Sequence, residues 1–68
     1  MRYAIVIEKA NGNLSAYVPD LPGCVATGRT RGVVMRRIQE AIHVHLHGMR
    51  TDGLPIPKPS TQAEYVDA

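Results

Sequence analysis

The sequence predicts an α+β fold of two layers, in which an antiparallel three-stranded β-meander precedes one helix and a fourth, C-terminal strand is left open. Two stretches rich in β-branched and aromatic residues, 2–9 and 14–18, flank an Asn-Gly pair, as in a β-hairpin. Apolar residues after Thr30 then recur at spacings of three and four, as on a helix. The length of 68 residues allows one domain at most.

The first predicted strand, residues 2–9, is apolar on both faces. Three large side chains share one face, namely Tyr3, Ile5 and Ile7. Ala4 and Val6 lie on the other face. A strand that is apolar on both sides indicates a central position, or a second layer supplied by another subunit.

An Asn-Gly turn at residues 11–13 leads into the second strand, residues 14–18. The pair favours a type I′ turn, because both central residues of that turn need a positive φ. Leu14, Ala16 and Val18 would face the same side.

A stiff connector follows the second strand. Pro19 has no backbone donor for a strand partner and therefore ends the pairing. Pro22-Gly23 is the pair preferred at the centre of a type II turn, and Asp20 can accept hydrogen bonds from nearby amides. Residues 24–28 then form a short third strand.

The helix is predicted to begin after Thr30, a good N-cap residue. Its apolar stripe consists of Val34, Ile38, Ala41, Ile42, His45, Leu46 and Met49. Gly48 and Gly53 are candidate stops. Residues 54–60 alternate proline with other residues, which indicates an extended chain, and residues 61–68 either add a fourth strand or fray.

Composition describes a small globular protein with no strong charge. Hydrophobic residues make up 44% and charged residues 21%, with a net charge of +2, which excludes a disordered chain and does not by itself imply nucleic acid. No apolar run reaches the length of a membrane span, and the N-terminal apolar stretch is too short for a signal peptide. We therefore expect a cytoplasmic protein without a membrane partner.

Self-association is expected from size. A chain this short has a marginal core and usually needs disulfides, a metal or a second subunit. One cysteine cannot form an internal disulfide, and no zinc-finger spacing is present. We predict a homo-oligomer, a dimer or larger, with Ala4 and Val6 at the interface.

Two candidate reactive groups stand out. Cys24 could pair with a histidine as a nucleophile, or it could be a small buried hydrophobe. Glu40, His43 and His47 share one helix face and could bind a divalent ion, but two or three ligands on one exposed helix bind weakly without others from elsewhere. A solvated helix face explains them as well. We predict no catalytic residues, no metal and no cofactor.

Residues 29–37 carry four arginines, at positions 29, 31, 36 and 37. Arginines beside free amides at a helix N-terminus could bind phosphate. They could equally form a solvated basic face whose stems cover apolar neighbours. Nucleic-acid binding through this cluster is therefore an alternative function, and Arg36 and Arg37 need not lie on the same patch as the other two.

The whole order of elements resembles the HicB-like antitoxin family of toxin–antitoxin systems. The resemblance rests on "YVPDLPGCVATGRT", residues 17–30, and on "GLPIPKPS", residues 53–60. It implies a degraded RNase H-like core without that enzyme's acidic metal site. It also implies oligomerisation and binding of a small RNA-cleaving toxin of the HicA type. Residues 1–68 read as a single HicB-like domain, without the C-terminal DNA-binding domain that many members add.

One departure from the family pattern concerns charge. The family helix usually follows Gly-Asp-Thr and begins with acidic residues, whereas residues 28–32 read Gly-Arg-Thr-Arg-Gly. Acidic residues there would attract a basic toxin, so the arginines suggest a different docking mode.

The predicted function is a non-catalytic protein that neutralises a HicA-type toxin by binding it directly. Residues predicted to contact the partner are Asp20, Leu21, Pro22, Arg29 and Arg31. The alternatives are nucleic-acid binding through the arginines, or a small hydrolase or nuclease relative that would use His43 or Asp20.

Overall fold

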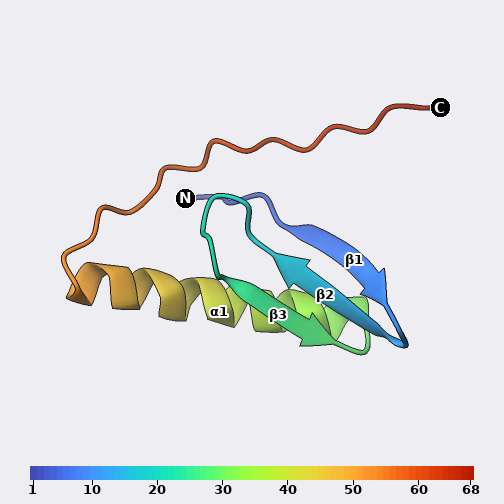
Figure 1. The fold of residues 1–68 in the computed structure, drawn as a ribbon, viewed down its shortest axis with the longest axis horizontal. Helices are drawn as coiled ribbons and strands as arrows, with labels where there is room; N and C mark the ends of the chain where they lie inside the picture. Colours follow the sequence, from blue (N-terminus) through green and yellow to red (C-terminus); the bar gives the residue numbers. More distant parts are fainter.

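The computed structural model describes residues 1–68 and contains three strands and one helix (Figure 1). These are β1 (Val6–Ala10), β2 (Asn13–Tyr17), β3 (Val25–Gly28) and α1 (Arg31–Thr51). The strands form one antiparallel sheet in the order β1-β2-β3. The helix lies along one face of the sheet (Figure 1). The two-layer α+β fold is confirmed.

The hairpin between β1 and β2 forms at the predicted place. Ala10 pairs with Asn13 across the two-residue loop. Gly12 has a φ of 68°, but no residue other than glycine has a positive φ. The predicted type I′ turn is therefore wrong, because that turn needs a positive φ at Asn11 as well.

The first strand begins later than predicted, at Val6 in place of Arg2. The register pairs Val6 with Tyr17, the last residue of β2. Continuing it would place Ala4 opposite Pro19, which has no N–H to donate. The amide of Val18 is also used elsewhere, since it donates to the carbonyl of Cys24. Residues 2–5 therefore have no regular backbone hydrogen-bonding partners in the chain that follows β2.

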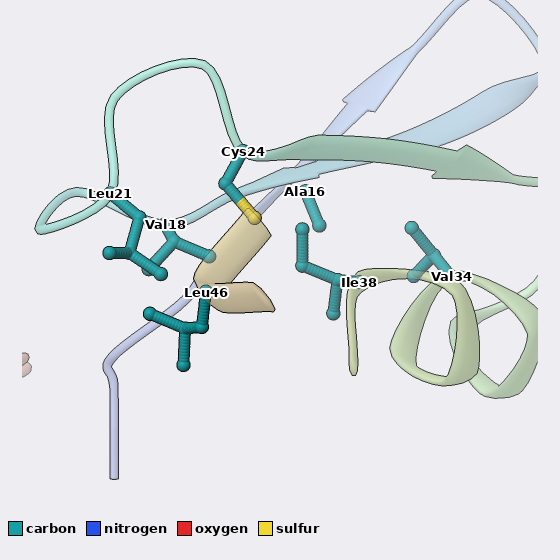
Figure 2. Close-up of a cluster of buried hydrophobic side chains, with 7 residues drawn as sticks. All are labelled: Ala16, Val18, Leu21, Cys24, Val34, Ile38 and Leu46. Carbon is teal, nitrogen blue, oxygen red and sulfur yellow. The ribbon is translucent and has the colours of Figure 1, made fainter. Parts of the chain in front are cut away.

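The core lies between the sheet and α1. Its buried members are Ala16, Val18, Leu21, Cys24, Val34, Ile38 and Leu46 (Figure 2). The predicted helix stripe is confirmed, with Ala41, Ile42 and Met49 packed against these residues. The helix lies close to β2 and β3 and farther from β1, although Ile7 of β1 packs against the core cluster. Apolar side chains of the first strand are therefore only half-buried.

Both ends of α1 are capped by local hydrogen bonds. The Thr30 hydroxyl accepts from the amide of Val33 at 3.1 Å, as predicted for an N-cap. At the other end Gly53 has a φ of 69° and donates to Arg50, while Leu54 donates to Met49. This pair of bonds is the Schellman motif, so Gly53 is the stop. The helix does not have the apolar length needed to cross a membrane.

Residues 54–68 return along the molecule without regular secondary structure. They pass the N-terminus and run in the same general direction as the chain leading into β1, but diverge from β1 toward the C-terminus (Figure 1). No backbone–backbone hydrogen bond joins residues 55–68 to the rest of the chain. The fourth strand left open by the sequence is not formed here.

Candidate functional site

The motif "VPDLPGC" forms a loop closed by its own backbone. The amide of Leu21 donates to the carbonyl of Val18, and the amide of Cys24 donates to the carbonyl of Leu21, both at 3.0 Å. A third bond, from the amide of Val18 to the carbonyl of Cys24, closes the loop at 3.2 Å. Gly23 has a φ of 84°, as the third residue of a type II turn requires. The predicted Pro22-Gly23 turn is confirmed.

This loop supplies three side chains to the core. Val18, Leu21 and Cys24 point toward α1 (Figure 2) and expose 2%, 0% and 3% of their surfaces. Leu21, predicted as a partner contact, offers no surface to another protein. Its burial fixes the loop on the helix, because a fully buried leucine contributes roughly 1.5–3 kcal/mol relative to an exposed one.

Asp20 points away from the core and binds the C-terminal segment, residues 54–68. Its Oδ2 accepts from the amides of Ser60 at 3.0 Å and Thr61 at 3.1 Å. Its Oδ1 accepts from the hydroxyls of Thr61 at 2.7 Å and Ser60 at 3.0 Å. The Thr61 hydroxyl and the two amides lower the pKa of Asp20 from 3.8 to about 2, because they bind the ionised form.

A second contact holds the same segment a few residues earlier. The Tyr3 hydroxyl donates to the carbonyl of Pro57 at 2.5 Å. Sequence reasoning missed Tyr3, Ser60 and Thr61 as a set. Asp20 and Ser60 are 40 residues apart, and no local spacing reveals such a pair.

The chemistry around Cys24 disfavours a nucleophile. The thiol is buried, and this burial raises its pKa, so the reactive thiolate is suppressed. His45 lines the same shallow hollow as Cys24, but no hydrogen bond joins the two side chains in the structure. The interpretation of Cys24 as a small buried hydrophobe is confirmed by its 3% exposure.

The other histidines lie on the exposed side of α1. His43 and His47 are exposed, whereas His45 is half-buried. No three side chains of the His, Cys, Asp and Glu types come close enough together to hold a metal ion.

Two of the four arginines lie in a basic depression at the hairpin end of the molecule. Arg29 and Arg31 line it together with Lys9, which sequence reasoning missed. The strand register could have revealed this lysine. Lys9 pairs with Leu14, and Leu14 pairs with Gly28, so Lys9 lies in the same row as the residue before Arg29. Arg37 instead donates to the carbonyl of Thr27 at 3.0 Å.

The residues predicted to contact a partner fall in two places. Asp20 and Pro22 precede β3, whereas Arg29 and Arg31 follow it. A strand of four residues separates the two groups by about 13 Å at ~3.3 Å per residue. One small ligand could not contact both groups, but the surface of a protein partner could.

Comparison with known proteins matches this arrangement to one family. The family described as the HicB_like antitoxin of bacterial toxin-antitoxin systems matches residues 3–68. A chain of the solved HicA3 and HicB3 toxin-antitoxin complex superposes with a TM-score of 0.76 and is 32% identical. That match covers 88% of this chain and 70% of the solved chain.

Similar proteins occur in a phage and an archaeon. An uncharacterised 14.9 kDa protein of Haemophilus phage HP1 is 39% identical over 98% of this chain, which spans 50% of the phage protein. A UPF0150 protein of Thermoplasma acidophilum is 30% identical over the full length of both. The family match over residues 3–68 and the identity to these relatives show that the chain belongs to the HicB-like antitoxin family.

Proposed function

We propose that this protein is a non-catalytic antitoxin that binds a small HicA-type toxin and neutralises it directly. The observation that carries the proposal is the likeness to a chain of the HicA3 and HicB3 toxin-antitoxin complex, at 32% identity and a TM-score of 0.76. That likeness covers 88% of the chain, and the family model matches residues 3–68.

Side-chain chemistry supports a binding role over catalysis. The Cys24 thiol is buried with a raised pKa, and the Asp20 carboxylate is occupied by Ser60 and Thr61. An active nucleophile or general base needs an accessible reactive group beside a partner that activates it. Neither group meets that condition, so a nuclease mechanism through Asp20 is disfavoured.

The proposed toxin contacts are the accessible members of the predicted set. Pro22, Arg29 and Arg31 are exposed, and Asp20 is half-exposed. If the toxin is basic, as the family resemblance implies, the two arginines would repel it. We therefore place the closest toxin contact at the Pro22 end of β3.

Calorimetric titration tests the proposal with two toxins. One is HicA3, and the other is a HicA-type protein encoded next to the gene of this protein. We expect saturable binding and loss of the toxin's RNA cleavage. Pro22→Arg should weaken binding at least tenfold, whereas Lys58→Ala should leave it unchanged. Absence of binding to both toxins, with RNA cleavage unimpaired, would refute the antitoxin role.

A second candidate function is nucleic-acid binding at the basic depression. Lys9, Arg29 and Arg31 line it from two sides, so three phosphates could be neutralised together. Binding of a short duplex should then weaken as salt rises, with a log–log slope of roughly −0.9 per phosphate contacted. Fluorescence anisotropy at low salt measures this. Lys9→Ala with Arg29→Ala and Arg31→Ala should abolish the slope, and unchanged binding would exclude the site.

We also propose that the chain self-associates through the outer face of the sheet. The register places Val6, Tyr17 and Val25 in one row on the side away from α1. Tyr17 and Val25 expose 39% and 63% of their surfaces, and apolar rows of this kind commonly mark interfaces. Light scattering should give a smaller mass for Val6→Asp than for Thr27→Asp in the neighbouring row. Equal masses would contradict the interface.

The proposed compartment is the cytoplasm. The single cysteine is free, which suits a reducing environment, and a partner that cleaves RNA would act there.

A further inference from the structure

An open slot lies between two extended segments at the edge of the molecule. Residues 2–4 form one wall and residues 59–64 form the other. Neither wall takes part in a backbone–backbone hydrogen bond. β1, which continues the first wall, pairs only with β2, so its other edge is also free. Unpaired edges of this kind can accept another strand.

Side chains hold the second wall, residues 59–64, in place at its N-terminal end. The Tyr3 hydroxyl binds the carbonyl of Pro57, and Asp20 binds Ser60 and Thr61. Beyond Thr61 no hydrogen bond to the rest of the chain is formed by residues 62–68. Tyr65 and Val66 expose 96% and 90% of their surfaces there, although both favour strands.

The direction of this segment determines what can fill the slot. Residues 54–68 run in the same general direction as the N-terminal stretch that leads into β1 (Figure 1). The same segment of a second copy, related by a two-fold axis, would run in the opposite direction. It would therefore be antiparallel to both walls, and each antiparallel pair could form regular hydrogen bonds.

We propose that two copies of this chain exchange the segment around residues 62–66, each placing it in the slot of the other. The contact is self-complementary, because the segment that fills the slot of the partner also forms one wall of the slot in its own copy. Across the exchanged strands the order becomes residues 2–4, segment, segment, residues 2–4, with no free edge at its centre.

This exchange rests on the proposed self-association and not on toxin binding. It uses the edge of the sheet, whereas the row of Val6, Tyr17 and Val25 lies on its outer face. A chain that used both interfaces would form an assembly larger than a dimer.

Two alanine-to-proline variants test the exchange without toxin. Ala63→Pro removes an amide inside the slot and should break the added strand. Ala68→Pro makes the same change outside the slot walls and serves as the control. We expect light scattering to give Ala63→Pro half the mass of the parent and of Ala68→Pro. The helical circular dichroism signal should stay the same, because residue 63 lies outside α1.

A mixed sample of labelled and unlabelled chains gives a second readout by isotope-filtered NMR. Contacts between residues 2–4 of one copy and residues 62–66 of another are expected. A monomeric parent at millimolar concentration would overturn the exchange. Equal masses for the two variants, with no contacts between copies at these residues, would also overturn it while leaving the outer-face interface and the antitoxin role standing.

Discussion

Residues 18–24 and residues 54–68 hold all five prolines of the chain, yet they obtain their shapes in different ways. The first segment is closed by three hydrogen bonds within its own backbone and buries Leu21 completely. The second makes no backbone–backbone hydrogen bond beyond Leu54 and is held by the side chains of Tyr3 and Asp20. Proline spacing alone therefore does not determine whether a segment becomes part of the core.

Asp20 connects the two segments. Its neighbour Leu21 points into the core, while its own carboxylate takes four hydrogen bonds from Ser60 and Thr61. The loop thus has an inward role in packing and an outward role in holding the C-terminal segment. A stiff loop serves both roles, because it fixes the directions of adjacent side chains.

The largest expected effect is the loss of stability when Leu21 is truncated, compared with the same change at Leu54 in the other segment. Leu21→Ala removes a fully buried side chain and should lower the free energy of unfolding by about 2–5 kcal/mol. Leu54→Ala, at a position that is 51% exposed, should change it by less than ~0.5 kcal/mol. Urea denaturation measures both. Similar losses at the two positions would contradict the difference between the segments.

A smaller effect on stability is expected at the end of β3, where Gly28 packs against α1. A Cβ added at Gly28 would lie 2.9 Å from the backbone nitrogen of Val34, so Gly28→Ala should cost about 1–3 kcal/mol by overpacking. Gly32→Ala meets no atom within 4 Å and should gain up to ~1 kcal/mol of helix propensity. Thermal unfolding of the pair tests this, and equal melting temperatures would contradict the close approach.

Much of the fold could be predicted because it depends on local chemistry. Pro22-Gly23, Thr30 and the helix stripe each act over a few residues, and each forms as expected. The start of the first strand could not be predicted, because it depends on the strand register, which would put Ala4 opposite Pro19. The bonds from Asp20 to Ser60 and Thr61 were missed for a similar reason, since they join residues about 40 positions apart.

Asp20→Asn should have the smallest effect on the free energy of unfolding, but it should strongly loosen the C-terminal segment. An amide keeps the shape of the side chain, but its Nδ2 cannot accept, so two of the four hydrogen bonds are lost, and the loss of charge weakens the others. Heteronuclear NOE values of residues 57–68 should fall in this variant, while those of α1 stay the same. Asp67→Asn, at an exposed position in the same segment, is the matched control. Unchanged order at Ser60 and Thr61 would exclude the contact as the holding force.

The pH dependence of the same contact has a definite sign. The pKa of Asp20 falls from 3.8 to about 2 in the folded chain. Its contribution to stability is therefore fully present above 3.8 and is lost as the pH falls through about 2. The C-terminal segment should stay held at mildly acidic pH and loosen only near pH 2.

The most direct measurement is an NMR titration of the Asp20 carboxyl carbon together with the amides of Ser60 and Thr61. The central claim is that the loop is a structural connector whose aspartate holds the C-terminal segment. It predicts one shared midpoint at about pH 2, because all three signals report the same hydrogen bonds. A carboxyl midpoint near 3.8, with the two amides unaffected, would contradict it.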